Sequence, residues 1–335
     1  MALEDLKEIV KKSITVGFLF ESNKERLKWT SLNGDIGFSK EITNRNIHRP
    51  GLALAGYVEL FSFDRVQIFG NTEIQYLQHL SFEDRIKAFE TIFRFNVPCL
   101  VVTNNNPLDK ELIGIATNHG ISLLQSPFET TKLTYFLGDF LDDQFAPQSV
   151  VHGSFIDVYG VGILLVGRSG IGKSEIALDL VERGHRLVAD DVVMVTRKGE
   201  GILIGAGTDV VKHFMEIRGL GFIDIRSIFG IRAIRFQKRV EVVVELLDWQ
   251  PDGEFTRTGL DHGHISVLGV EIPHIKLPIF PGKNITVIAE VIALDYLLRH
   301  YGYDAAKEFA SRLDATIASK SRGKRVIDYF EHDFE

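Results

Sequence analysis

The sequence is poor in cysteine: its 335 residues contain a single one, Cys99. One cysteine cannot form a disulfide within the chain, so a disulfide-stabilised secreted scaffold is excluded. Cys99 lies in the apolar run 97–102, where a thiol is ordinarily a buried packing residue. We therefore expect a structural thiol at this position rather than a catalytic nucleophile.

An excess of basic residues is also missing. The chain has 38 Lys and Arg against 45 Asp and Glu, which gives a net charge of −7 with His neutral. Sequence-independent nucleic-acid binding needs a basic surface, so this class of function is disfavoured. We expect no nucleic-acid partner.

Long apolar runs are absent as well. No uninterrupted apolar stretch approaches the ~20 residues that a membrane-spanning helix needs. The polar stretch 3–12 contains no hydrophobic signal core. We expect a cytoplasmic protein with no membrane partner. The composition, 45% hydrophobic and 25% charged, is that of a globular chain, and the length favours two domains.

The first half of the chain alternates apolar runs with amphipathic segments, which is typical of a small α/β domain with a mainly parallel sheet. We predict strands over residues 65–69, 98–103 and 121–125. The predicted helices span residues 71–79, 81–95, 108–118 and 129–140. This half of the sequence has no catalytic constellation, and we interpret Asn104–Asn106 as a strand-to-helix loop.

A charged, proline-containing segment, Asp142–Gln148, should end the last of these helices, and we place a domain boundary there. The predicted domains are residues 1–147 and 148–335. The second is richer in strand patterns, which cover residues 150–158, 162–166, 186–196, 202–204, 240–247 and 265–270. Two helical patterns close the chain, over residues 286–300 and 305–319.

One motif dominates the second half. It fits the Walker A pattern of Gly, four residues, then Gly-Lys-Ser, and its members are Gly167, Arg168, Ser169, Gly170, Ile171, Gly172, Lys173 and Ser174. An apolar strand precedes it and a helical pattern follows it, which is the context that a phosphate-binding loop requires. In such a loop, backbone amides surround phosphate oxygens, Lys173 reaches the terminal phosphates and Ser174 coordinates Mg²⁺. The sequence therefore predicts a site for ATP.

Two adjacent carboxylates, Asp190 and Asp191, end the apolar strand that follows. In a phosphate-loop protein one of them is the Walker B aspartate, which binds Mg²⁺ directly or through water. Adjacent residues of a strand face opposite ways, so only one of the two can enter the site easily. Because both flanking faces are apolar, the pattern does not choose between them.

Signatures of other nucleotide-binding classes are missing. The chain lacks the Asn-Lys-x-Asp run that reads guanine and the His-Arg-Asp and Asp-Phe-Gly runs of eukaryotic-type protein kinases. The sequence instead resembles the HPr kinase/phosphorylase family of bacterial enzymes. The motifs of that family occur in order as Val151–Gly153, the phosphate loop with Glu175 after it, Val188–Asp191, Met215–Asp224, Arg257–Asp261 and Pro278–Asn284.

This resemblance covers the whole architecture, a variable N-terminal domain followed by a catalytic domain. It implies ATP-dependent phosphorylation of a serine in the phosphocarrier protein HPr. It also implies the phosphate-dependent dephosphorylation of phosphoseryl-HPr, with pyrophosphate as the product. Such an enzyme regulates carbon metabolism and sugar uptake.

The resemblance also implies roles for individual residues. Asp191 would take the proton from the seryl hydroxyl and return it in the reverse reaction, as a general base does. His152 would orient or tune that aspartate. Lys173 would neutralise the phosphates, while Ser174 and Glu216 would hold Mg²⁺.

A second set of implied features concerns the transferred group and the assembly. Arg257 would stabilise charge on the transferred phosphoryl group, as an arginine finger does. Gly219 and Gly221 would suit a mobile loop that closes over the reaction. The family further implies a β-rich phosphate-loop core like that of phosphoenolpyruvate carboxykinase, and a homohexamer formed through the catalytic domains.

The chain departs from the family in the segment that resembles the phosphorolysis loop. It has Phe280 where a basic residue is usual, and Lys283 where the family has Arg. Because the attacking phosphate needs an anion site, we expect a comparatively weak phosphorylase activity beside an intact kinase activity.

Two other functions stay open on the sequence: a phosphate-loop kinase of small metabolites, and a non-enzymatic nucleotide-sensing module. The run Asp261–His264 suggests a metal site, but no carboxylate or Cys partner at zinc-like spacing accompanies it. We therefore expect these histidines to be ordinary loop residues.

Overall fold

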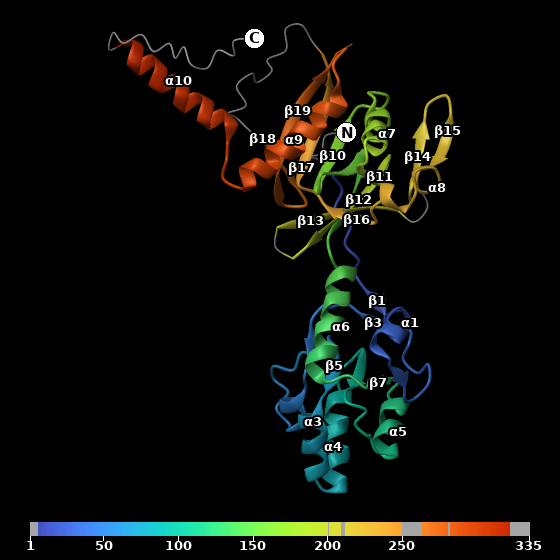
Figure 1. The fold of residues 1–335 in the computed structure, drawn as a ribbon. Coiled ribbons are helices and arrows are strands. Elements are labelled where there is room, and N and C mark those ends of the chain that lie inside the picture. The colour runs from blue at the N-terminus through green and yellow to red at the C-terminus, as the bar shows by residue number, and fades with distance from the viewer. Residues whose placement is uncertain (1–5, 200, 209–211, 250–262, 281, 322–335) are drawn as a thin grey trace. The chain divides into compact units, whose positions relative to one another are not determined.

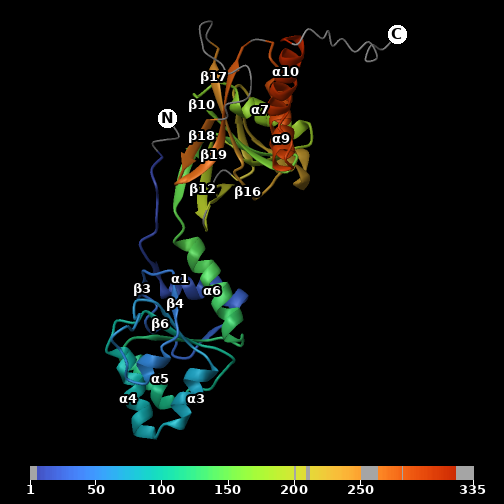
Figure 2. The same cartoon turned by 90° about the vertical axis from the view of Figure 1, so that its left-hand side faces the viewer.

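The computed structural model describes residues 6–199, 201–208, 212–249, 263–280 and 282–321. Two compact units make up the chain (Figures 1 and 2). Residues 9–147 form one unit, and the described residues from 148 onward, joined by residues 6–8, form the other. None of the described helices combines the length and apolar character that crossing a membrane requires.

The first unit is built on a five-stranded sheet in the order β2, β7, β6, β5, β4. Its strands are β2 (Thr30–Ser31), β4 (Ile47–His48), β5 (Val66–Phe69), β6 (Cys99–Val102) and β7 (Ser122–Gln125). All neighbours pair in parallel except β2, which is antiparallel to β7. The mainly parallel sheet predicted from the alternating pattern is therefore confirmed.

Helices pack on both faces of this sheet because its strands are apolar on both sides. One face carries α2 (Gly51–Leu54), α3 (Asn71–His79), α4 (Phe82–Phe93) and α5 (Lys110–Asn118), and the other carries α1 (Val16–Leu27) and α6 (Thr130–Gln144). Cys99 is fully buried, and this burial raises the pKa of its thiol to about 12. Such a thiol stays protonated near neutral pH, which confirms the structural role.

The predicted end of the last helix was wrong. Helix α6 continues to Gln144, and its buried stripe of Leu133, Leu137 and Leu141 holds it to the sheet through the acidic segment. The helix ends only just before Pro147, which cannot extend it. Helix α1, which follows the short strand β1 (Ile14–Thr15), was not predicted from the sequence.

The second unit contains two larger sheets. A six-stranded sheet has the order β11, β9, β10, β17, β19, β18, and a four-stranded sheet has the order β16, β13, β12, β8. The six-stranded sheet consists of β9 (Ser154–Val158), β10 (Val161–Gly167), β11 (Arg186–Ala189), β17 (Val242–Asp248), β18 (Gly263–Val267) and β19 (Val270–Ile279). The four-stranded sheet consists of β8 (Gln148–His152), β12 (Val192–Lys198), β13 (Ile202–Gly207) and β16 (Gln237–Arg239).

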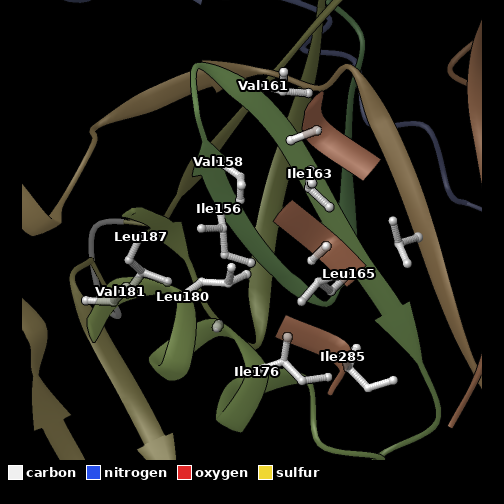
Figure 3. Close-up of a cluster of buried hydrophobic side chains, with 14 of the residues drawn as sticks. Ile156, Val158, Val161, Ile163, Leu165, Ile176, Leu180, Val181, Leu187 and Ile285 are labelled. Atoms are coloured by element: carbon white, nitrogen blue, oxygen red, sulfur yellow. The ribbon is translucent and has the colours of Figure 1, made fainter. Parts of the chain in front are cut away.

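The remaining elements complete this unit. They are the hairpin strands β14 (Phe214–Ile217) and β15 (Gly221–Asp224), the helices α7 (Lys173–Glu182), α8 (Ile225–Phe229), α9 (Ile285–His300) and α10 (Ala305–Ser321), and the short 3-10 helix η2 (Ile231–Ala233). The main core packs α7 and α9 onto the six-stranded sheet (Figure 3). Ile163 and Leu165 of β10 meet Ile176 and Leu180 of α7 in that cluster. The phosphate loop joins β10 to α7, so this packing fixes both of its ends.

Two stretches that we predicted as single strands are each divided between the two sheets, and a third, 265–270, contains the turn between β18 and β19. The predicted strand 150–158 breaks at Gly153, and the predicted strand 186–196 breaks at Asp190–Asp191. At each break the chain passes from one sheet to the other, so that β8 pairs with β12 and β9 pairs with β11. Gly153 permits the first crossing because it has no Cβ. A Cβ at this position would collide with the carbonyl oxygen of Leu165. Asp191 makes the second crossing with a φ of 61°.

Glu290 ties α9 to the end of α7. Arg183 donates two hydrogen bonds to its carboxylate, at 2.9 and 2.6 Å, and the His185 ring lies 3.0 Å away. Chiefly because of the Arg183 hydrogen bonds, the pKa of Glu290 is lowered to about 2 from an ordinary value of 4.5. A lowered pKa means that the carboxylate stabilises the fold above pH 4.5 and that this contribution is lost as the pH falls toward 2.

Glu290→Gln should therefore lower the free energy of unfolding at pH 7 by about 2 kcal/mol, because Arg183 and His185 lose their carboxylate. Thermal melts of both proteins at several pH values check this. The difference in Tm between wild type and Glu290→Gln should be smaller at pH 3 than at pH 7. The control variant Glu271→Gln, at an exposed position of β19, should leave Tm nearly unchanged. An equal gap at both pH values would contradict the assignment.

Candidate active site

The phosphate loop has the backbone that its glycines were expected to allow. Gly167, Gly170 and Gly172 all have positive φ, at 144°, 78° and 104°. At Gly167 a Cβ would lie 2.7 Å from the carbonyl oxygen of Leu246, so only glycine fits there. Lys173, the first residue of α7, reaches back across the loop and donates to the carbonyl oxygens of Gly167 and Arg168, at 3.1 Å each.

Asp190 is the buried member of the carboxylate pair, with 3% of its surface exposed. The Ser174 hydroxyl lies 3.1 and 2.9 Å from its two oxygens, and the Ser154 hydroxyl donates to Oδ1 at 2.5 Å. Burial raises the pKa of the Asp190 carboxyl, and the hydrogen bonds from both serines oppose that rise. The residue in contact with the loop serine is therefore Asp190, a choice that the sequence left open.

Asp191 lies beside it but faces the open side of the site. Its side chain is exposed, while its backbone carbonyl accepts a hydrogen bond from the Gly153 amide at 3.2 Å. His152 ends β8 opposite Val192, the residue after Asp191. Among the described residues, no hydrogen bond or ion pair joins the side chains of His152 and Asp191, so their expected coupling is not made in this state.

These groups surround an open pocket of about 230 Å³. It is lined by Ser169, Gly170, Gly172, Lys173, Ser174, Glu175, Asp190, Asp191, Glu216 and Arg218. Four of these side chains are acidic and two are basic, so a cation that accompanied a triphosphate would lessen its repulsion by the carboxylates. The described residues contain no group of three or more His, Cys, Asp or Glu placed to hold a metal by themselves. Mg²⁺ suits this arrangement because it usually keeps several waters and binds substrate phosphates.

The hairpin β14–β15 supplies one wall of the pocket. Met215 is buried in the core under α7, which places Glu216 and Arg218 at the rim. The Arg218 guanidinium lies 3.4 Å from the Ser169 hydroxyl, although the sequence had not singled out this arginine. Gly219 lies in the turn of this hairpin and Gly221 begins β15, with φ values of 87° and 91°, and the mobile loop that we expected there stays a prediction.

Other predicted residues lie away from the pocket. Arg168 turns outward and pairs with Asp248 at 2.5 and 2.7 Å, and Ile171 packs against the core. Lys283 donates to the Pro278 carbonyl at 3.2 Å and lies 5.2 Å above the Phe280 ring. Neither Phe280 nor Lys283 lines the pocket.

Some expectations fall on residues outside the described ranges. Arg257 is one of them, as are Asp261 and His262. His264 is described, and the prediction that it is a loop residue was wrong, because it lies in β18. That strand pairs with β19, which extends the six-stranded sheet.

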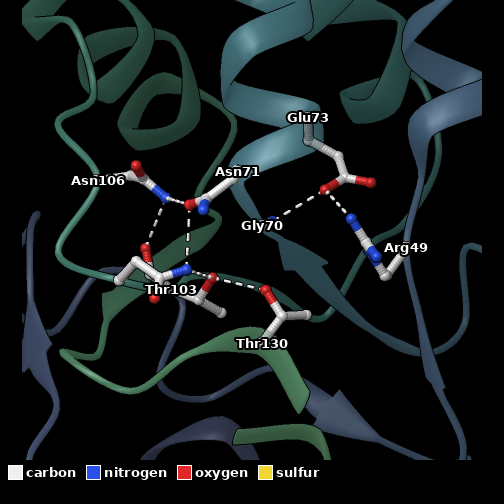
Figure 4. Close-up of polar contacts among 8 residues, drawn as sticks. Arg49, Gly70, Asn71, Glu73, Thr103, Asn106 and Thr130 are labelled. Atoms are coloured by element: carbon white, nitrogen blue, oxygen red, sulfur yellow. Dashed lines mark hydrogen bonds and ion pairs between the residues drawn. The ribbon is translucent and has the colours of Figure 1, made fainter. Parts of the chain in front are cut away.

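The first unit has a polar cluster of its own at the carboxyl ends of β5 and β6 (Figure 4). The Asn104 and Asn106 amides both donate to the side-chain oxygen of Asn71, at 3.0 and 2.8 Å. The Glu73 carboxylate accepts from the Gly70 amide and from Arg49, at 2.9 and 2.8 Å. The members of this cluster thus satisfy one another, in keeping with a strand-to-helix loop.

Known protein families match this chain along most of its length. Residues 143–313 match the family described as HPr Serine kinase C-terminal domain, and residues 14–141 match HPr Serine kinase N terminus. The chain belongs to the HPr serine kinase family. The HPr kinase/phosphorylase of Chloroherpeton thalassium is 58% identical over 98% of each chain. That of Prosthecochloris aestuarii is 52% identical over 99% of each.

A solved structure, the Hpr(Ser) kinase/phosphatase from Coxiella burnetii, is also similar. It aligns with 31% identity over 48% of this chain and 97% of its own, with a TM-score of 0.43.

Proposed function

We propose that this member of the HPr serine kinase family transfers the γ-phosphoryl group of ATP to a seryl hydroxyl of HPr. In the opposite direction, inorganic phosphate attacks phosphoseryl-HPr, which regenerates the serine and releases pyrophosphate. The observation that carries the proposal is the meeting of Lys173, Ser174, Asp190 and Asp191 in one pocket, in a chain that matches this family along nearly its whole length. The reactions couple the phosphorylation of HPr to carbon metabolism.

Four side chains from the family motifs have distinct tasks in this reaction. Asp191 is the exposed carboxylate, and it accepts the seryl proton as the oxygen attacks phosphorus. Lys173 neutralises the terminal phosphates, and Arg257 stabilises the charge on the transferred group. His152 lies on the neighbouring strand, from which it would orient Asp191 once substrate is bound.

Mg²⁺ fits the oxygen donors of this pocket. Ser174 and Glu216 would hold the ion, and Asp190 would do so directly or through water. The hydrogen bonds between Ser174 and Asp190 support this set, since they already bring a hydroxyl and a carboxylate together beside the loop. When bound, the ion would neutralise charge on the phosphates.

The proposal includes three statements about architecture. Residues 1–147 and 148–335 are the N-terminal and catalytic domains. The catalytic domain has a phosphate-loop core like that of phosphoenolpyruvate carboxykinase. The enzyme assembles as a homohexamer, for which exposed apolar side chains along α9, Val287, Val291, Leu294 and Leu298, offer contact surface. Sedimentation equilibrium of the full chain tests the last statement.

ATP turnover by the purified protein discriminates this function from its rivals. Turnover should require HPr and Mg²⁺ together, and a panel of small hydroxylated metabolites should not replace HPr. Turnover with a metabolite alone would favour a small-metabolite kinase. Tight ATP binding without any turnover would favour a nucleotide-sensing module.

Phe280→Arg should raise the rate of phosphate-driven dephosphorylation by about ten- to a hundredfold, because in the segment that resembles the phosphorolysis loop the arginine would add one charge-assisted contact of about 1.5–3 kcal/mol to the attacking phosphate. Lys283 does not supply that contact in this state, since it is bound to the Pro278 carbonyl. The dephosphorylation rate is measured with phosphoseryl-HPr and the kinase rate with HPr, for wild type and the variant. The kinase kcat at saturating ATP should change less than about threefold. Fast dephosphorylation by wild type at low phosphate, with no gain from arginine, would contradict this hypothesis.

A further inference from the structure

Ser154 is a partner of the buried carboxylate of the pocket that does not belong to the phosphate loop. It is the first residue of β9, has no exposed surface, and its hydroxyl donates to Oδ1 of Asp190 at 2.5 Å. Ser174 donates to the same carboxylate from the start of α7. One carboxylate is thus held by two hydroxyls from two separate elements, in addition to the backbone amide of Asp191.

Packing alone does not explain a serine at this position. All five residues of β9 are buried, and the next two, Phe155 and Ile156, belong to the hydrophobic cores on either side of the sheet. A small apolar residue would satisfy such a strand without the cost of burying a hydroxyl. The Ser154 hydroxyl has the Asp190 carboxylate as its partner, so the serine acts on the pocket.

The Ser154 hydroxyl matters because the Ser174 hydroxyl has another task. Ser174 is the loop serine that would hold Mg²⁺, so its oxygen must serve the ion while its proton points at Asp190. Without Ser154 the carboxylate would keep Ser174 and the neighbouring Asp191 backbone amide as partners, both of which belong to the segments that line the pocket. Ser154 adds a donor from the sheet itself, fixed by the register of β9 against Leu165 of β10, and so limits rotation of the carboxylate about its Cβ–Cγ bond.

We infer that Ser154 is a positioning residue for phosphoryl transfer, which orients the Asp190 carboxylate toward the Mg²⁺ that accompanies the nucleotide. The inference rests on the proposed function. Ser154 itself touches neither the nucleotide nor HPr; it acts through Asp190. Such outer partners of a metal-binding carboxylate ordinarily change metal affinity or activity by about 10–100-fold when they are removed.

Calorimetric titration of ADP into the full chain, with and without Mg²⁺, tests this directly. In wild type, Mg²⁺ should tighten ADP binding. Ser154→Ala should reduce that Mg²⁺-dependent gain about tenfold while it leaves the Mg²⁺-free affinity for ADP within twofold. In kinase assays the same variant should need about tenfold more Mg²⁺ for half-maximal rate, with the KM for HPr little changed.

Two matched variants separate positioning from structure. Ser149→Ala removes another fully buried hydroxyl of the same unit, which donates to the Lys7 carbonyl at 3.0 Å, and it should keep the wild-type Mg²⁺ response. Ser154→Thr retains the hydroxyl and should keep most of the Mg²⁺-dependent increase in ADP affinity. If the threonine variant does not fold, as judged by its thermal melt, the comparison of the two alanine variants decides.

The inference is overturned if Ser154→Ala keeps the wild-type Mg²⁺-dependent gain, or if Ser149→Ala loses as much of it. These titrations contain no HPr, so they decide the role of Ser154 even for an enzyme that fails to phosphorylate HPr. That failure would instead overturn the proposed function.

Discussion

Lys173→Ala should reduce phosphoryl transfer to HPr to near background, a loss of about a thousandfold in kcat/KM, and should weaken ATP binding. The Lys173 ammonium is held across the mouth of the phosphate loop by the carbonyls of Gly167 and Arg168. The terminal phosphates of ATP must enter at that point, and the ammonium is the loop's own cation for them. Its loss removes charge stabilisation from the phosphates throughout the transfer.

The fold should survive this change. Lys173 begins α7, where alanine is a good helix former, and it belongs to none of the described hydrophobic clusters. Circular dichroism and thermal melting check the fold, while initial rates and ATP titrations check the function. Lys276→Ala is the matched control, because it also removes one lysine but at an exposed position of β19. A folded Lys173→Ala enzyme with an unchanged turnover rate would refute the assignment of the loop.

Asp191→Asn should lower kcat in both directions by about 10²–10⁴, because the seryl hydroxyl loses the group that accepts its proton. Nucleotide binding should stay within a few-fold of wild type, since Asp191 is exposed and the Ser174 hydroxyl is hydrogen-bonded to Asp190 instead. Stopped-flow or steady-state rates with saturating ATP measure the effect on kcat.

The neighbouring aspartate provides the sharpest control. Asp190→Asn should act mainly on Mg²⁺-dependent nucleotide binding, because Asp190 is the carboxylate in contact with Ser174. Two substitutions at adjacent positions should therefore give different signatures, one in kcat and one in metal dependence. If Asp190→Asn reduced kcat at saturating Mg²⁺ and Asp191→Asn did not, then Asp190 would be the proton acceptor and the assignment of the two aspartates would be wrong.

Much of this architecture could be predicted from local patterns. The phosphate loop was predictable because it depends on near neighbours: an apolar strand, glycines that accept positive φ, and a helix that begins at Lys173. The parallel sheet of the first unit followed for a similar reason, since strands that alternate with helices of this length leave few other arrangements. In both cases, short-range periodicity carries the information.

The parts that could not be predicted depend on contacts between distant segments. The breaks at Gly153 and at Asp190–Asp191 occur inside apolar runs that read as continuous strands, and only the pairing of β8 with β12 and of β9 with β11 shows where each run changes sheet. The same crossings place Ser154 against Asp190, 36 positions apart in the chain. A lone serine in an apolar run gives no signal of such a partner.

The central claim is that this pocket phosphorylates a serine of HPr with Asp191 as the proton acceptor. Its most direct test is the intact mass of HPr, followed by phosphosite mapping, after incubation with ATP, Mg²⁺ and either wild-type or Asp191→Asn enzyme. The account predicts one phosphoryl group on one serine with wild type, its removal with release of pyrophosphate when phosphate replaces ATP, and almost no modification by the variant. Unmodified HPr with wild type, or wild-type rates with Asp191→Asn, would contradict it.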